Sequence, residues 1–195
     1  VALQLGSMRG SLAPHEEERL VNELVRIPYK VEQLLEKEGE IKEVARKYAR
    51  NKNMLFIGRG MSFPIAQEGA LKLKEVSYIH AEALAAGEMK HGPIALLEPG
   101  VPVLAVIPKD SLYEKTLSNI QEVKARNASL IAVCTEGDRF VPEHAGSVIE
   151  TPWTDEEFTP FLSVIPLQLL SFHIALILGR EIDQPRNLAK SVTVE

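Results

Sequence analysis

The sequence is poor in cysteine, in paired metal ligands and in positive charge, and each shortage excludes a class of protein. Cys134 is the only cysteine among 195 residues, so an internal disulfide and a cluster of metal-binding thiolates are both excluded, and we expect a reducing, cytoplasmic environment. No two histidines have the i,i+4 spacing of a zinc-binding helix, so we expect no metal site. The net charge of −5 and the pI near 5.6 argue against nucleic acid or an anionic membrane as a partner.

Long apolar runs are scarce as well. The region from Leu162 to Leu178 is interrupted by Pro166, Gln168 and His173, so we expect no membrane-spanning helix, which needs ~20 apolar residues. The first ten residues, VALQLGSMRG, lack the basic segment and apolar core of a secretory signal. They also lack an initiator Met and resemble the end of a helix, so we expect the chain to be cut from a longer protein.

The residues that follow are polar and strongly helix-forming. HEEERLVNELVRI places Leu20, Leu24 and Ile27 on one helical face, and Pro28 is expected to break or restart the helix. KVEQLLEKE and EIKEVARKYAR continue the pattern around Gly39. We therefore assign residues 1–50 to a helical arm and residues 51–195 to a compact domain with a functional C-terminal tail.

The domain combines short apolar strands with helices. Strands without polar alternation, separated by helices, are typical of a parallel sheet covered on both faces. The sequence therefore predicts an α/β fold, a three-layer α/β/α sandwich. The expected strands are 53–60, 101–108, 129–135 and 146–152, and the expected helices are 64–79, 111–126 (opened by a Ser cap) and about 158–178, the last stopped by Gly179.

The helix PIAQEGALKLKEVSYI carries the first candidate chemical groups. At about 100° per residue, Glu68, Lys72 and Glu75 fall within roughly 60° of one another. Two carboxylates beside an amine can perturb each other's pKa and supply a base for proton transfer. Taken alone, a solvated face with i,i+4 ion pairs is the better explanation of the pattern. The opposite face is formed by Ala66, Ala70, Leu73 and Ser77.

Three other places carry candidate groups. The turn Gly58-Arg59-Gly60-Met61-Ser62 leads from a strand into a helix, where phosphate can bind, although such a turn also needs glycine for backbone reasons alone. His91 lies in a loop before Gly92-Pro93, where a histidine can shuttle protons but is more often simply a surface residue, and His80 is expected at a helix end. The tail DQPRNLAKSVTVE contains Pro185, expected to fix a turn, and Lys190, whose amine becomes a nucleophile toward a carbonyl if the tail docks.

Two long segments make a resemblance specific. EGALKLKEVSYIHAEALAAGEMKHGPIALL (68–97) and IPLQLLSFHIALILGREIDQPRNLAKSVTVE (165–195) resemble the end of the glucosamine-6-phosphate synthase family, the glutamine–fructose-6-phosphate aminotransferases. Members of that family have a glutaminase domain with a Cys nucleophile and two sugar isomerase (SIS) domains of flavodoxin-like fold. The present sequence matches the second SIS domain and the helix that joins it to the first.

The resemblance implies a role for four residues. Lys190 is implied to form the Schiff base with open-chain fructose-6-phosphate, and Glu75 to move a proton between C1 and C2. Lys72 is implied to assist near the sugar oxygens. His91 is implied in ring opening at the site of a neighbouring subunit, so the resemblance also implies a homodimer, and no cofactor is needed. Because the glutaminase and first SIS domains are absent, the chain alone is expected to be inactive in the full reaction.

Two other functions remain open at this point. SIS domains also serve as non-catalytic sugar-phosphate-binding modules in regulators, and an isolated half could be a structural dimerisation unit. A sensor would not require a Lys190 and Glu75 pair, which favours the enzyme.

Overall fold

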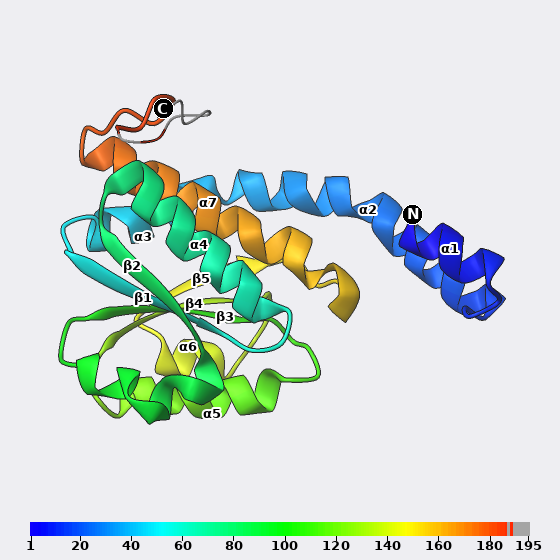
Figure 1. Cartoon of the computed structure of the whole chain (residues 1–195), viewed down its shortest axis with the longest axis horizontal. Coiled ribbons are helices and arrows are strands. Elements are labelled where there is room, and N and C mark those ends of the chain that lie inside the picture. Colours follow the sequence, from blue (N-terminus) through cyan, green and yellow to red (C-terminus); the bar gives the residue numbers. More distant parts are fainter. Residues whose placement is uncertain (187, 189–195) are drawn as a thin grey trace, which may run out of the picture.

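The computed structural model describes residues 1–186 and 188, and a five-stranded sheet lies at its centre (Figure 1). Every strand pair is parallel, and the order across the sheet is β2-β1-β3-β4-β5. This order reverses between β1 and β3, as in other doubly wound sheets. The predicted parallel α/β fold is confirmed. The strands are β1 (Asn53–Gly58), β2 (His80–Ala85), β3 (Pro102–Ile107), β4 (Ser129–Thr135) and β5 (Ser147–Thr151).

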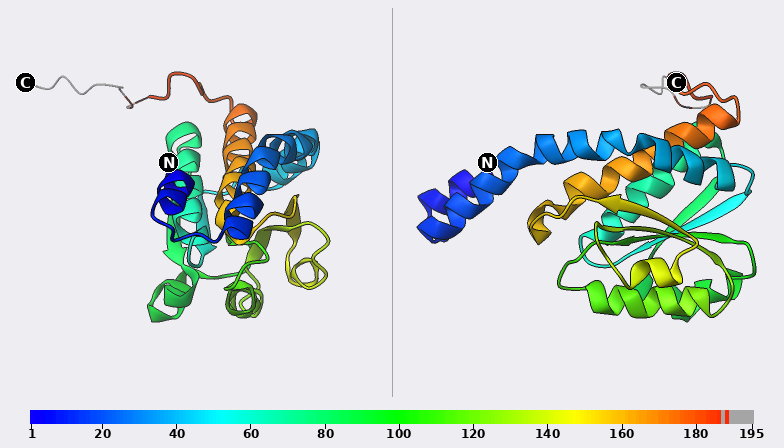
Figure 2. Two further views of the ribbon diagram at one scale, coloured as in Figure 1. Left: turned by 90° about the vertical axis from the view of Figure 1, so that its right-hand side faces the viewer. Right: turned by 180° about the vertical axis from the view of Figure 1, so that it is seen from behind.

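Helices cover both faces of the sheet, which confirms the three-layer sandwich (Figures 1 and 2). One core contains Met54 and Phe56 of β1, and the other contains Leu55 and Ile57. Because successive side chains enter different cores, both sets must be apolar, which explains the unbroken apolar strands. The first core is covered by α3 (Glu38–Tyr48), α4 (Ser62–Ser77) and α7 (Thr159–Ile177), and the second by α5 (Tyr113–Lys124), α6 (Val141–His144) and the 3-10 helices η1 (Ala86–His91) and η2 (Pro93–Leu96).

The edge strand β2 is the strand that the sequence does not predict. It pairs with β1 alone, in a register that sets His80 beside Asn53. His80 and Glu82 are exposed while Ala81 is buried, so the strand lacks the continuous apolar run of its neighbours. Its Ala and Glu residues also have low strand propensity. The expectation that His80 ends a helix is wrong, because it begins this strand.

The arm is more continuous than predicted. α2 (Pro14–Glu36) runs through Pro28 without a break and projects beyond the sheet, and α1 (Ala2–Met8) lies against its far end (Figures 1 and 2). Pro28 is exposed, so water can reach the carbonyl group that loses its hydrogen bond. Buried Leu20 and Ile27 pack with Phe158. The predicted face is wrong at one position, because Leu24 is 42% exposed.

A buried acidic residue attaches α2 to the domain. Glu23 accepts a hydrogen bond of 2.6 Å from the Thr154 hydroxyl and pairs with Lys30. Burial alone raises the pKa of a carboxyl, but the hydrogen bonds from Lys30 and Thr154 bring the pKa of Glu23 below its ordinary value. Lys30 also lies 5.5 Å from the ring centroid of Trp153. Charged and aromatic contacts therefore supplement a small apolar patch.

The predicted helices α7 and α5 are both present, and α5 differs from the prediction in how it begins. α7 follows the prediction and ends before Gly179, whose φ of 64° suits glycine. The predicted Ser cap of α5 is wrong: Asp110 accepts the hydrogen bond from the Leu112 amide, and Ser111 binds the Glu156 carboxylate instead.

Within residues 1–186 and 188, the stretch Glu156–Ile177 is the one helical segment long and apolar enough to cross a membrane, by length and composition alone. Half of its most apolar window is buried inside the structure, as in the core helix of many folded domains. The expectation that no segment has these properties is therefore not supported, and such a helix by itself is weak evidence for a membrane span.

α4 and α7 approach closely at Gly69. A Cβ atom added at Gly69 would lie 2.3 Å from Cδ2 and 3.1 Å from Cβ of Leu167, which is fully buried. Movement of the leucine side chain alone does not relieve this contact, because its Cβ is also close. Gly69 therefore sets the distance between the two helices.

Gly69→Ala should destabilise the chain. The added methyl group overpacks the interface by about 1–3 kcal/mol while improving helix propensity by about 1 kcal/mol, so we expect a net loss of up to about 2 kcal/mol. The matched control is Gly39→Ala, which lies in α3 with no atom within 4 Å of the added Cβ and should stabilise. Urea unfolding of both variants measures the difference, and equal stabilisation by both would contradict the close approach.

Candidate active site

One exposed stripe of α4 gathers two carboxylates around an amine. The Lys72 Nζ lies 2.7 Å from Oε2 of Glu75 and 3.7 Å from Oε1 of Glu68. The three side chains are between a quarter and two-fifths exposed. On the opposite side Ala66, Ala70, Leu73 and Ser77 are buried. The predicted division of the helix into a charged face and a second, apolar face is confirmed, and the second face lies in the core.

Lys72 is held in its charged form. The hydrogen bond to Glu75 is the main cause that raises the pKa of Lys72, and burial opposes it only in part. A charged ammonium cannot attack a carbonyl, so in this geometry Lys72 acts as a cation and a hydrogen-bond donor. Glu75 is the carboxylate beside it.

A cavity of about 260 Å³ opens beside this stripe, between α4 and α7. Its lining combines the Lys72 side chain with the polar groups of Gln168 and Ser171 and the apolar surface of Phe172. Val76 and Ile182 complete it. This volume is slightly below the range of typical small-molecule sites. The cavity is therefore consistent with one wall of a site that a further surface completes.

The structure separates His91 from this stripe. His91 is exposed at the end of η1. Neighbouring Ala86 and Met89 belong to the α5 core, whereas α4 covers the opposite face (Figure 1). Within one chain the sheet therefore lies between His91 and the Lys72–Glu75 pair. Lys190 lies outside the described residues.

The start of the tail lies beside the end of α4. The backbone N–H of Arg186 donates a hydrogen bond of 2.8 Å to the hydroxyl oxygen of Tyr78. The predicted turn at Pro185 is confirmed, because its carbonyl accepts a hydrogen bond from the Leu188 amide at 3.4 Å. Sequence reasoning missed Tyr78, since a tyrosine after a helix carries no distinctive signal.

The glycine turn after β1 is filled by the protein's own groups. A Cβ at Gly58 would lie 2.3 Å from the carbonyl oxygen of Ser62, so glycine is required there for backbone reasons. The Arg59 guanidinium donates to Asn119 at 2.9 Å. On the neighbouring loop, the amide and hydroxyl of Ser111 donate to Glu156 at 2.8 and 2.7 Å. The turn therefore has a structural explanation that needs no phosphate.

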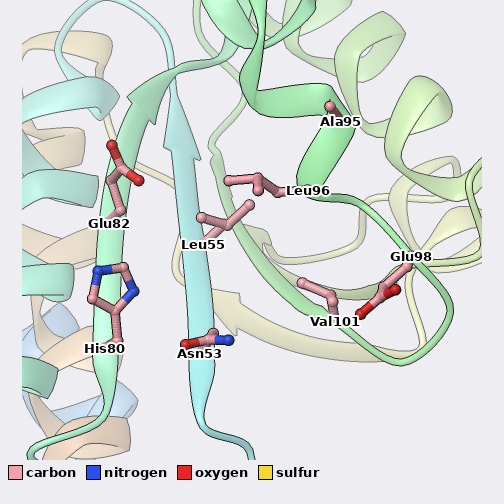
Figure 3. A pocket seen from close by; sticks show the side chains of 8 residues that line it. All are labelled: Asn53, Leu55, His80, Glu82, Ala95, Leu96, Glu98 and Val101. Carbon is pink, nitrogen blue, oxygen red and sulfur yellow. The ribbon is translucent and has the colours of Figure 1, made fainter.

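A larger cavity of about 400 Å³ is lined by Leu55, which belongs to the core on the opposite face of the sheet from α4. Figure 3 shows its lining side chains. The cavity opens at the amino ends of β1 and β2, between His80, Glu82 and Leu96, and two carboxylates line it. This cavity contains no amine, whereas Lys72 lines the cavity beside the α4 stripe. We therefore place the candidate site at the α4 stripe rather than here.

Thiol and metal chemistry have less support. Burial raises the pKa of the Cys134 thiol to about 12, so its reactive thiolate is not formed near neutral pH. Among the described residues no group of three or more His, Cys, Asp or Glu side chains could hold a metal ion.

Comparison with known proteins gives consistent matches. The SIS domain family matches residues 47–178. A glutamine–fructose-6-phosphate aminotransferase (isomerizing) of Thermus thermophilus is 55% identical over the whole chain, which covers 32% of that protein. The Aquifex aeolicus aminotransferase of the same name is 54% identical over 92% of the chain and 30% of its own length. The chain thus spans about a third of these relatives.

A solved structure shares the fold. The C-terminal domain of glucosamine-fructose-6-phosphate aminotransferase from Francisella tularensis superimposes with a TM-score of 0.87 at 41% identity. The match covers 93% of this chain and 51% of that one.

Glu75→Gln should lower the pKa of Lys72, because it removes the carboxylate that raises this pKa most. Glu68→Gln is the matched control on the same face and should lower it less, since its oxygen is 3.7 Å away rather than 2.7 Å. NMR titration of the Lys72 side chain measures both shifts. A larger shift in the Glu68 variant would contradict the pairing described here.

Proposed function

The chain belongs to the SIS domain family, and from this premise we propose that it is the isomerase part of a glutamine–fructose-6-phosphate aminotransferase. In this proposal it helps to convert fructose-6-phosphate and glutamine-derived ammonia into glucosamine-6-phosphate, in the cytoplasm and without a cofactor. Residues 1–50 form the arm from a preceding SIS domain, and residues 51–195 form the second SIS domain. The glutaminase and first SIS domains supply the remaining functions.

The Lys72–Glu75 pair is the observation that carries the proposal. An isomerisation between adjacent carbons needs one carboxylate to relay a proton and one uncharged amine to activate the carbonyl. Lys72 is 2.7 Å from Glu75 and its pKa is raised, so it stays a cation and is not the imine-forming amine. The resemblance implies Lys190 for that role. A non-catalytic sensor has no need for this arrangement.

The proposed reaction proceeds through two imines. The neutral amine of Lys190 attacks C2 of the open-chain ketose, and loss of water gives the first imine. Ammonia then adds at C2 and expels the Lys190 amine, so that the nitrogen of the product is in place. Glu75 removes a proton from C1 and returns it to C2, which moves the double bond to C1. In the same change the C1 hydroxyl loses its proton and becomes the aldehyde, while the imine nitrogen gains a proton and becomes the amine at C2.

Lys72 and His91 have supporting roles in the proposal. The Lys72 ammonium donates hydrogen bonds to sugar oxygens and offsets the negative charge that develops as C1 loses its proton. His91 assists ring opening at the site of a neighbouring subunit. Its position across the sheet from the α4 stripe supports a homodimer, because one chain does not bring the two together.

Lys190→Arg in the full-length enzyme should abolish sugar isomerisation and leave glutamine hydrolysis partly intact, because arginine keeps the charge but cannot form the imine. Glu75→Gln should still allow borohydride to trap the sugar on Lys190, while proton exchange at C1 falls ~10²–10⁴-fold. Mass spectrometry locates the trapped sugar. Trapping on Lys72, or normal turnover by the Lys190→Arg enzyme, would contradict the assigned roles.

Mixed dimers test the role of His91. We expect a dimer with one His91→Ala subunit and one Lys190→Arg subunit to have about half of the wild-type activity, because one of its two sites receives an intact His91 from the other subunit. Two affinity tags isolate the mixed dimer, and each homodimer of a single variant is the inactive control. No recovery in the mixed dimer would mean that His91 acts within its own chain.

A further inference from the structure

Tyr78 lies where three segments of the chain meet. Its hydroxyl oxygen accepts a hydrogen bond of 2.8 Å from the backbone N–H of Arg186, whose guanidinium lies 4.3 Å from the centroid of the tyrosine ring. The guanidinium of Arg180, just beyond α7, lies 5.4 Å from the same centroid. One side chain therefore joins the end of α4, the end of α7 and the start of the C-terminal tail.

The backbone conformation at position 78 does not favour a tyrosine. It caps α4 in the left-handed conformation, with φ 65° and ψ 15°. Glycine is the usual residue at such a position, because a side chain there meets steric strain. A residue held in a sparsely populated backbone conformation is a reason to look for a task of its side chain. The contacts with Arg180 and Arg186 provide that task.

The clamp, by which we mean the contacts of Tyr78 with Arg180 and Arg186, places the tail close to the α4 stripe. Glu75 precedes Tyr78 by three residues, or about 4.5 Å along the helix axis. Lys190 follows Arg186 by four residues, so the covalent chain alone keeps their Cα atoms within about 14 Å. Arg186 is therefore held beside the end of α4 that carries Glu75, and Lys190 is joined to it by a short length of chain.

We propose that Tyr78 is a positioning residue for the isomerase reaction: it holds the chain at Arg186, so that the segment bearing Lys190 begins beside Glu75 and Lys72. The proposal rests on the proposed function. The tyrosine touches no reacting atom and acts through the tail. Its hydroxyl binds a backbone amide, so this part of the clamp does not depend on the side chain at position 186.

The clamp is moderate in strength. It combines one hydrogen bond with a partly exposed cation–π contact, and together these shift the ratio of attached to detached tail by about 5- to 30-fold. Loss of the clamp should therefore lower the yield of the Lys190 imine by a similar factor at a fixed sugar concentration. It should not affect a reaction that does not involve the tail amine.

Tyr78→Gly is the decisive variant, because it suits the left-handed backbone while removing the whole clamp. In the full-length enzyme we expect a melting temperature close to that of the wild type, unchanged glutamine hydrolysis and a 5- to 30-fold fall in borohydride trapping of fructose-6-phosphate on Lys190. Tyr78→Phe keeps the ring and loses the acceptor, so its trapping yield should fall between the two. NMR of the 195-residue chain should show faster hydrogen exchange of the Arg186 amide in Tyr78→Phe.

Asn127→Gly is the matched backbone control. Asn127 is the other non-glycine residue with positive φ, at 57°, among the described residues, and it lies between α5 and β4. Its replacement should leave both trapping and hydrolysis at wild-type levels.

Three results would overturn the proposal. They are wild-type trapping by Tyr78→Gly, an unchanged Arg186 amide in Tyr78→Phe, and a parallel loss of melting temperature, hydrolysis and trapping, which would mark a structural role. Failure of the proposed function has a different signature, since Lys190→Arg would then turn over normally whatever the effect of Tyr78.

Discussion

The close packing of α4 against α7 is the constraint on which the rest of the arrangement depends. Because Gly69 has no side chain, the two helices approach so closely that Leu167 occupies the space that a side chain at position 69 would fill. This contact fixes the rotation of α4, with Ala70 and Leu73 in the core. The same rotation turns Glu68, Lys72 and Glu75 outward as one stripe. A rotation that turned this stripe into the core would bury three charged side chains, at a high desolvation cost.

Charges in this protein are used in two different ways. Glu23 is buried and its partners Lys30 and Thr154 attach the arm to the domain, so its task is structural. The Lys72–Glu75 pair is partly exposed beside a cavity and has no comparable task in holding elements together, since both residues lie on one helix. Exposed pairs of this kind contribute little to stability. Their position beside a cavity therefore fits the proposed chemistry better than a role in folding.

The parallel sheet divides the molecule into two chemical halves. α4, the cavity beside it and the start of the tail lie on one side, while η1 with His91 lies on the other. The proposed function brings the two halves together in a homodimer, with His91 of one chain at the site of the other. The two ends of the α4 stripe also differ, because the start of the C-terminal tail binds Tyr78 at the C-terminal end of α4.

The sequence by itself determined the parallel sheet, four of its five strands and the charged face of α4. These depend on local periodicity, which side chains of adjacent residues reveal directly. Tertiary structure decided the rest. β2 is a strand because β1 offers it a free edge, α2 passes through Pro28 because Leu20 and Ile27 hold it on the domain, and Ser111 binds Glu156 rather than capping α5. The Tyr78 contact joins residues 108 positions apart, and no local pattern encodes such a pairing.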